Sequence, residues 1–551
     1  MENRKYVKKR SLCLKYAAAI NASITTVGFG INISWTSPAL PHLTNSVSQF
    51  PVSIMQGAWI ASLNGCGSIL GYLLSIPFIN WLGPKRTLLL LAIPQIISWI
   101  LICLGRNWII LCLARVIGGI GYGAGLCATS AYVGQIGDES TRGIFLTLIK
   151  LTINIGIFIT MFLGAFLSYN TMNLALLGIP IIFIISFSFM PDSNQFQNIA
   201  VVENENEGLV GNIVLKEKTV DVLKENTVDV LKENTVDVLK GETVDALEEK
   251  TVVVLNDNIV DVLQERTIDF LMEDALLLNE TTLNGFNDNK HVTNKNQDLK
   301  ETIPNGKQNT IAEKKNLLNN KKQNKSQKSI LWRLFVLRNN QKALLIILVA
   351  TLTDIFSGHM AIVSYTQQIF EYSGASLKAE YAALFLGALK IAASLISTLV
   401  VEKFGRRVLF FSTGLLAALA HGLVGLFFFL KMYLKVDVSS VTWLPLFGVS
   451  MYEIVGSVGF SSLYYIYQGE LFSNDVKGVG VTCTNIAYEV IAFVVKFYFQ
   501  MVIYDIGIYT LFWGFGICSI IGSGLTYWIS PETKGKSLEE IQNLLRGSRK
   551  I

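Results

Sequence analysis

The sequence predicts an all-α membrane protein in which twelve transmembrane helices form two six-helix bundles. Of the 551 residues, 51% are hydrophobic and only 16% are charged, against roughly 25% in soluble domains. The charges gather at the N-terminus, in short basic turns, in one central block and in the C-terminal tail. Between them run apolar stretches of about 20 residues, which are long enough to cross a bilayer as helices. The net charge of +5 lies in loops, so it favours contact with anionic lipid and not a nucleic-acid partner.

A short sequence motif that occurs once in each half of the chain indicates an internal duplication. Gln135 is followed seven residues later by an Arg-Gly pair, and Glu470 by a Lys-Gly pair at the same interval. Basic clusters also close an early apolar stretch at residues 83–86 (GPKR) and a later one at residues 405–407 (GRR). Many transporters are built from two such membrane units. The duplication therefore predicts a carrier.

The apolar stretches and the basic turns together set the expected topology. The expected spans centre on Thr25, Ser68, Ile96, Gly121, Ile155, Ile181, Ala350, Ala392, Ala420, Val455, Ala492 and Cys518. Basic residues follow the second, fourth, eighth and tenth spans and also fill the N-terminus, so these turns and both termini are expected to be cytoplasmic. The expected parts are an N-terminus (1–13), a first bundle (14–190), a linker (191–335), a second bundle (336–530) and a tail (531–551).

The linker contains an eight-residue repeat that begins at Thr219 (TVDVLKEN), recurs from Thr227 and Thr235, and then decays. Eight residues leave about 80° of rotation per repeat on an α-helix, so its Val and Leu positions form no single apolar stripe. A coiled coil is not expected, because it requires a period of seven or eleven. Expansion of a short repeat in a tolerant, disordered loop is the first interpretation, and a regulatory or docking role is the second.

Several motifs resemble the sugar porter branch of the major facilitator superfamily. Residues 531–541 (PETKGKSLEEI) are similar to its tail motif, residues 115–123 (RVIGGIGYG) to its fourth-span motif, and residues 402–407 (EKFGRR) to its loop after the eighth span. Residues 35–40 (WTSPAL) resemble the first-span exit of insect facilitated trehalose transporters. The resemblance implies the major facilitator fold, alternating access and a small-molecule solute in the plasma membrane. It covers both membrane halves but not residues 192–330.

In this family, Glu and Arg groups at the cytoplasmic helix ends form a latch when the carrier closes inside. The resemblance assigns eight residues to gating: Arg115, Gln135, Arg142, Glu402, Arg406, Arg407, Glu470 and Lys477. In the first half the family's usual Glu is Gln135 here, so that half of the latch is expected to be weaker. Glycines along the fourth span are expected to let helices approach closely.

The central cavity is where the chain departs from the family. Sugar porters hold hydroxyl groups with amide side chains, which offer both donors and acceptors. At the matching positions this chain has two cationic and two anionic residues, and of the seventh-span motif only Ser-Gly survives. The expected solute-binding residues are Lys150, Asp354, Ser357, Lys390, Tyr464, Tyr465, Tyr488 and Glu489.

Ionisable side chains at mid-membrane cost several kcal/mol unless they are paired or hydrated. The four charges are therefore expected to form structural pairs or to bind a charged or zwitterionic solute, unless a shift in register places some of them elsewhere. Asn32 stands where proton-coupled relatives have Asp, which favours downhill uniport. The leading function is facilitated transport of a sugar, and the alternative is a non-transporting sensor or scaffold. No cofactor, metal site, protein partner or enzymatic activity is expected.

Overall fold

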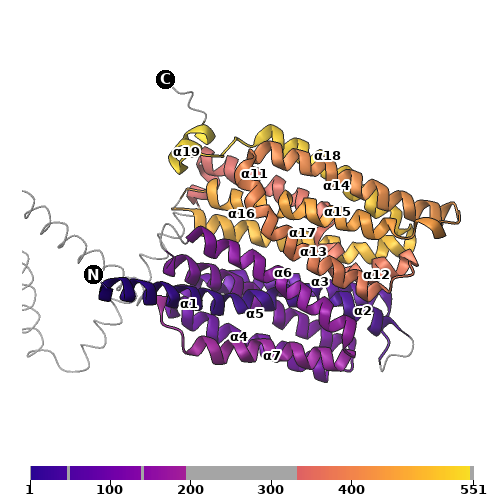
Figure 1. The fold of residues 1–551 in the computed structure, drawn as a ribbon, viewed down its shortest axis with the longest axis horizontal. Helices are drawn as coiled ribbons and strands as arrows, with labels where there is room; N and C mark the ends of the chain where they lie inside the picture. The colour runs from indigo at the N-terminus through magenta and orange to yellow at the C-terminus, as the bar shows by residue number, and fades with distance from the viewer. Residues whose placement is uncertain (1, 46–49, 138–141, 194–331, 474, 547–551) are drawn as a thin grey trace, which may run out of the picture. The chain divides into compact units, whose positions relative to one another are not determined.

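The computed structural model describes residues 2–45, 50–137, 142–193, 332–473 and 475–546, and these residues are largely helical (Figure 1). The predicted linker and its repeat lie outside the described residues, except for a few residues at the linker's two ends. The first bundle contains α1 (Glu2–Ser34), α2 (Thr36–Thr44), α3 (Ile54–Leu82), α4 (Pro84–Leu104), α5 (Trp108–Ile136), α6 (Arg142–Phe166) and α7 (Tyr169–Ser188).

The second bundle begins after the linker and ends in a short tail helix. Its elements are α11 (Arg338–Phe356), α12 (His359–Ser373), α13 (Ala379–Lys403), α14 (Arg406–Phe428), η1 (Phe429–Tyr433), η2 (Ser439–Val441), α15 (Leu444–Val458), α16 (Phe460–Glu470), α17 (Lys477–Asp505), α18 (Ile508–Ile529) and α19 (Leu538–Arg546). Figure 1 shows the start of α1 and the tail helix α19 at the same end of the helices. We call this the terminal end, and the other the far end.

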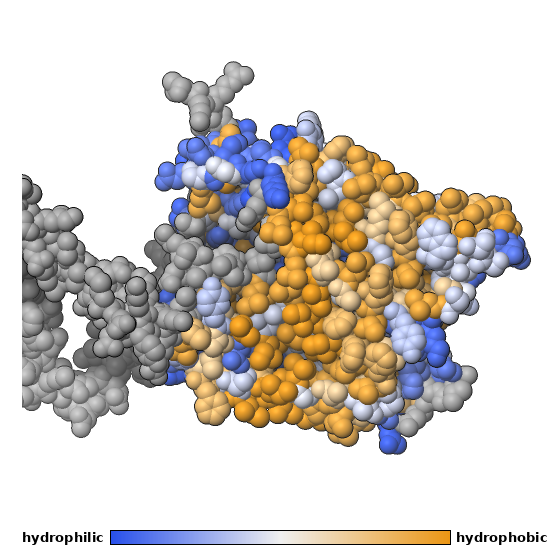
Figure 2. Space-filling model, in the orientation of Figure 1, coloured by the Kyte–Doolittle hydropathy of each residue, from blue (hydrophilic) through white to orange (hydrophobic). Residues whose placement is uncertain are grey.

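The predicted all-α class is confirmed. Within the described ranges, eleven helical segments are long and apolar enough to cross a membrane. The 33-residue helix α1 occupies the place of the first expected span and packs against α5 and α6. Figure 2 shows apolar side chains in a broad band across the helices, with hydrophilic residues gathered toward the ends. Such a band is the surface expected of helices that face lipid.

Glycines allow the first bundle to pack closely, as expected from the fourth-span motif. Helices α3 and α5 cross with Gly67 and Gly119 facing each other, and a Cβ added to Gly119 would lie 2.9 Å from the Cα of Gly67 and clash with the Asn64 carbonyl oxygen. Helices α1 and α6 meet in the same way, because a Cβ on Gly30 would clash with the Ile153 carbonyl oxygen. Small residues at these crossings bring the backbones into direct contact.

We expect Gly119→Val to destabilise the fold by about 2–3 kcal/mol, because the two helix backbones would have to separate to admit the side chain. The measurement is the melting temperature of the purified protein in detergent. Gly178→Val in α7 is the matched control, since nothing lies within 4 Å of a Cβ added there. Equal melting temperatures for the two variants would show that the crossing tolerates a larger side chain.

Two spans of the second bundle are broken near mid-depth. Helix α11 ends at a turn in which Gly358 has φ +88°, and α12 starts directly after it. A Cβ at Gly358 would lie 2.5 Å from the Phe515 ring, so both the backbone angle and the packing require glycine there. Helices α15 and α16 are separated by Gly459. Broken helices place polar backbone and side-chain groups inside a membrane protein only where these groups line a cavity or are buried in protein.

Candidate functional site

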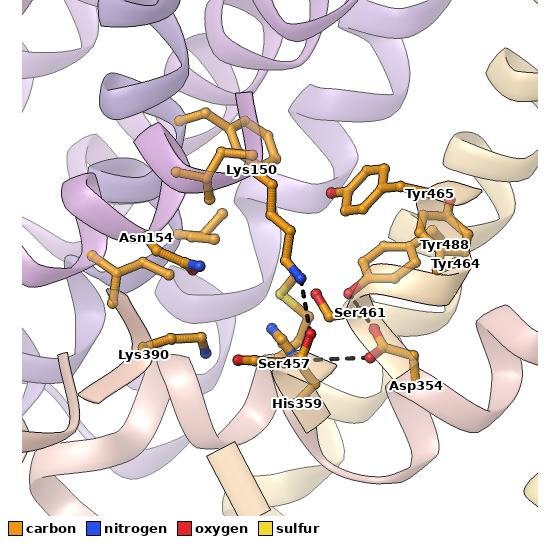
Figure 3. Close-up of a pocket in the computed structure, with 15 residues that line it drawn as sticks. Lys150, Asn154, Asp354, His359, Lys390, Ser457, Ser461, Tyr464, Tyr465 and Tyr488 are labelled. Carbon is orange, nitrogen blue, oxygen red and sulfur yellow. Dashed lines mark hydrogen bonds and ion pairs between the residues drawn. The ribbon is translucent and has the colours of Figure 1, made fainter. Parts of the chain in front are cut away.

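A cavity lies between the two bundles and is bordered by both helix breaks (Figure 3). Its wall from the first bundle comes from α1 and α6, and its wall from the second bundle from α11, α12, α13, α15, α16 and α17. The lining residues are Phe29, Ile33, Lys150, Ile153, Asn154, Ile157, Asp354, His359, Met360, Lys390, Ser457, Ser461, Tyr464, Tyr465 and Tyr488. Six of the eight expected solute-binding residues therefore line one cavity.

Lys150 reaches from the first bundle across the cavity to the second. Its ammonium donates to the carbonyl oxygen of Ser457 at 2.9 Å and to the hydroxyl of Ser462. Both serines lie beside the break between α15 and α16, and the Ser462 hydroxyl also donates to the Ser457 carbonyl at 2.6 Å. The break thus supplies the acceptors for a cation at mid-depth.

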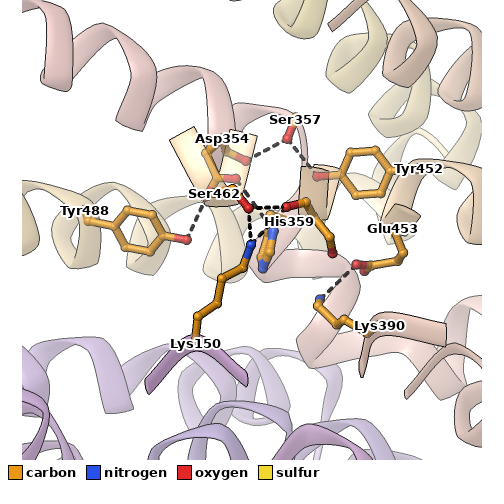
Figure 4. Close-up of polar contacts among 10 residues, drawn as sticks. Lys150, Asp354, Ser357, His359, Lys390, Tyr452, Glu453, Ser462 and Tyr488 are labelled. Carbon is orange, nitrogen blue, oxygen red and sulfur yellow. Dashed lines mark hydrogen bonds and ion pairs between the residues drawn. The ribbon is translucent and has the colours of Figure 1, made fainter. Parts of the chain in front are cut away.

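Asp354 faces the cavity from the last turn of α11 and is 2% exposed. Its Oδ2 accepts a hydrogen bond from the Tyr488 hydroxyl at 3.0 Å, and its Oδ1 lies 3.6 Å from Nδ1 of His359 (Figure 4). Tyr488 packs against Tyr464, whose ring centroid is 5.5 Å away, and Tyr464 packs against Tyr465. A carboxylate and three tyrosines therefore form one side of the cavity.

Lys390 forms an ion pair that the sequence analysis did not anticipate. Its Nζ lies 2.9 Å from Oε2 of Glu453, and both side chains are about 5% exposed. The pair joins α13 to α15 within the second bundle (Figure 4). Glu453 was visible as an ionisable residue inside an apolar stretch, which is itself a signal of a functional or paired position.

Two expected solute-binding residues lie outside the cavity lining. Ser357 is fully buried behind it, where its hydroxyl bonds to the Asp354 carbonyl and to the Tyr452 hydroxyl, each at 2.7 Å. Glu489 is also buried, but its Oε2 is near Gly65, at 3.2 Å from the position of an added Cβ. The expected convergence of four charges on one cavity is therefore wrong for Glu489.

Lys496 lies seven residues after Glu489 on α17, so the two side chains share one face of that helix. The ammonium of Lys496 donates to Oδ1 of Asn64 on α3 at 2.8 Å, and this bond joins the two bundles. Like Glu453, Lys496 is an ionisable residue within a span that the sequence analysis missed.

The bundles make further polar and aromatic contacts toward the far end. The Thr36 hydroxyl donates to the Ser364 carbonyl at 3.0 Å, and the backbone N–H of Gln367 donates to the Ser37 hydroxyl at 3.1 Å. Trp59 of α3 packs on Phe497 of α17 with ring centroids 4.8 Å apart. In contrast, each ion pair found among the described side chains of the terminal end joins residues of the same bundle. The contacts between the bundles thus close the far end.

Arg115 does not belong to the predicted cytoplasmic latch. It lies two turns from the start of α5, at the far end, and is fully buried. Its guanidinium donates to the Asn32 carbonyl at 2.6 Å, to the Asn32 side-chain oxygen at 2.7 Å and to the Ile60 carbonyl at 3.2 Å. The expectation failed because the fourth span runs toward the terminal end, so that its first turns are farthest from the latch.

The structure forms one contact of the predicted second-half latch. Arg406 pairs with Glu470 at 3.3 Å, whereas the guanidinium of Arg407 donates to the Tyr527 carbonyl. Lys477 donates to the Gly469 carbonyl at 2.6 Å, and Gln135 is exposed. The side chains of Arg142 and Glu402 lie outside the described residues, so their gating roles remain predictions.

The tail motif adds a carboxylate to this cluster. Glu532 accepts hydrogen bonds from the backbone N–H groups of Arg406 and Arg407, at 2.9 and 3.2 Å, and so caps the start of α14. Burial raises the pKa of Glu532, but these backbone donors, that of Lys534 and the charge of Arg406 outweigh it, and the pKa lies below its usual value. The tail is thereby attached to the second bundle.

Two helix bundles, broken spans and a polar cavity between them define a multi-pass membrane protein with the major facilitator fold. The sequence matches the family described as "Sugar (and other) transporter" over residues 17–236 and 289–545. The chain belongs to this family, which confirms the resemblance found in its motifs. The family's description is that of transporters.

The relatives with curated names include insect trehalose transporters. The facilitated trehalose transporter Tret1 of Drosophila virilis is 24% identical over 532 residues, which cover 96% of this chain and 48% of the relative. Tret1 of Aedes aegypti is 24% identical, with 96% of this chain and 55% of the relative covered. The chain thus spans about half the length of these two relatives. The facilitated trehalose transporter Tret1-2 homolog of Drosophila simulans is 24% identical, and the match covers 96% of this chain and 90% of the relative.

Solved structures support the same fold. The inward open conformation of the xylose transporter XylE from E. coli matches with a TM-score of 0.61 and 14% identity, covering 96% of this chain and 99% of that one. A crystal structure of a D-xylose-proton symporter matches with the same TM-score and identity, and 95% and 99% coverage. At this level of identity the likeness concerns the fold.

Proposed function

We propose that this chain is a facilitated-diffusion carrier for a sugar, such as trehalose or a hexose, in the plasma membrane. The observation that carries the proposal is the polar cavity between the bundles, because its walls come from both of them. A solute held there would be exposed to one side or the other as the bundles rock, which is alternating access. The names of the insect relatives support a sugar as the solute.

Three further features support the membrane orientation and the coupling in this proposal. The basic residues of the turns support a cytoplasmic terminal end. The closed far end would then face outside, and the structure would represent an inward-facing state. Asn32 cannot exchange a proton at physiological pH, and its side-chain oxygen accepts from Arg115 at 2.7 Å. Uniport therefore fits the first bundle better than proton coupling through this position.

The test is uptake of labelled trehalose and glucose by cells that express the chain at their surface. We expect saturable uptake that a protonophore does not change. Asn32 exchanges no proton, so downhill transport would not require a proton gradient. Lys390→Asn and Asp354→Gln provide the comparison, since they restore family-like amides at the cavity. Uptake of charged solutes alone, lost in either variant, would contradict a sugar as the solute. No uptake of any solute despite surface expression would favour a sensor.

A further inference from the structure

The cavity contains two opposite charges that do not form an ion pair with each other. Four ionisable side chains other than tyrosine line it, namely those of Lys150, Asp354, His359 and Lys390. Lys390 is already paired with Glu453 at 2.9 Å. With His359 in its neutral form, which predominates at neutral pH for an ordinary imidazole, the remaining charges are Lys150 and Asp354.

Lys150 offers its charge to an anion. None of the ion pairs found among the described residues includes Lys150, so no carboxylate oxygen there lies within 4.0 Å of the Lys150 Nζ. The acceptors of its ammonium are an uncharged carbonyl oxygen and a hydroxyl. An ammonium has three N–H groups, so these two acceptors leave one donor for an anionic oxygen.

Asp354 offers its charge to a cation. Its Oδ1 is buried without a hydrogen-bond donor, since the His359 nitrogen at 3.6 Å is too distant and Tyr488 donates to the other oxygen. The Tyr464, Tyr465 and Tyr488 side chains line the same side of the cavity. Tyrosine rings attract cations through their faces, and an ammonium N–H would give Oδ1 a charge-assisted hydrogen bond.

The two charges lie on opposite bundles, Lys150 on α6 and Asp354 on α11 (Figure 3). A neutral solute leaves both charges without an ion pair, and a solute with one charge leaves one of them without an ion pair. A solute that carries an ammonium and a carboxylate satisfies both and keeps the cavity neutral, which matters because uncompensated charge at mid-membrane is costly. Such a solute would also connect the two bundles.

We propose that the cavity accepts a small hydroxylated zwitterion, with its ammonium at Asp354 and its carboxylate at Lys150. The proposal rests on the carrier function above and adds a solute class to it. It also gives Lys150 a role beyond a structural bridge, because the carboxylate would bind the third N–H or replace the serine acceptors.

The experiment compares four solutes of one carbon skeleton as competitors of labelled glucose uptake. They are glucose, glucosamine, which adds an ammonium, gluconate, which adds a carboxylate, and glucosaminate, which has both. We expect glucosaminate to inhibit at concentrations about tenfold lower than either singly charged solute, because only it gains both charge-assisted bonds. Equal inhibition by glucose and glucosaminate would overturn the proposal.

Variants assign the two ends of the solute. In Asp354→Asn the advantage of glucosaminate over gluconate should fall below about threefold, and in Lys150→Gln so should its advantage over glucosamine. Asp437→Asn and Lys378→Gln are matched controls, since both residues are exposed in loops. An unchanged advantage in both cavity variants would refute the assignment.

A second readout separates this proposal from the carrier function. The purified wild-type protein is heated in detergent with each of the four solutes, and binding raises the melting temperature. Stabilisation by glucosaminate without any glucose uptake would support the zwitterion site and contradict the sugar carrier. Glucose uptake without stabilisation or inhibition by glucosaminate would support the sugar carrier and contradict the zwitterion site.

Discussion

Replacing Arg115 with methionine is expected to destabilise the first bundle by about 4 kcal/mol. Its guanidinium joins α1 to α3 by donating to both oxygen atoms of Asn32 and to the Ile60 carbonyl. Methionine has a similar length, so the cost comes from the two Asn32 oxygens, which lose a buried donor at about 1–3 kcal/mol each. The Ile60 carbonyl lies in the interior of α3 and keeps its helical hydrogen bond. Relief of the buried charge reduces this cost but does not cancel it, because the three oxygens and the Trp35 ring, 5.4 Å away, already stabilise the cation.

The measurement is the melting temperature of detergent-purified protein together with the fraction of protein that reaches the cell surface. Arg106→Met is the matched control, because Arg106 is exposed in the turn before α5. Arg115→Lys should fall between wild type and Arg115→Met, since a lysine keeps the charge but lacks the fork that spans two helices. A melting temperature of Arg115→Met within about 2 °C of wild type would mean that the hydrogen bonds contribute little.

Arg115 also shows which features of the fold could be predicted from the sequence and which could not. Apolar length and basic turns determine the number, order and direction of the spans, because each helix must satisfy its own backbone groups in lipid. The direction of the fourth span places Arg115 at the far end, so its exclusion from the latch could have been predicted. Its contact with Asn32 could not, because residues so distant in the sequence meet only through the packing of α1 on α5.

Some features of the cavity could likewise be predicted from the sequence, and others could not. Lys150, Asp354 and Lys390 were found from their register in spans of a known family, and they line the same cavity. The partner of Lys390 was not found, because Glu453 lies on another helix and a charge pattern along the chain does not reveal pairs between helices. Lone charges within apolar stretches were nevertheless visible at Glu453 and Lys496, and the cost of burying each of them implies a partner.

Replacing Lys496 with methionine is expected to leave the buried carboxylate of Glu489 without the cation that shares its face of α17. Both residues are less than 5% exposed, on one face of α17 against α3. The two side chains form no ion pair within 4.0 Å among the described residues, so the cost of leaving the carboxylate buried should lie below the roughly 3–5 kcal/mol of a broken buried ion pair. Melting temperatures in detergent should show this loss for Lys496→Met, and the double variant Glu489→Gln/Lys496→Met should recover most of it.

The carboxylate left without its cation should also change the balance between the two states of the proposed carrier. Closing the far end buries Glu489 against Gly65 and forms the bond between Lys496 and Asn64, whereas separating α3 from α17 there would let water reach the carboxylate. Lys496→Met should therefore favour the state that is open at the far end. Cys66, next to Gly65, should then react several-fold faster with a membrane-impermeant thiol reagent added from outside, and Cys66→Ser should abolish this increase. If Lys496→Met labels at the wild-type rate, the charges on α17 do not control the far end, and their contribution is confined to stability.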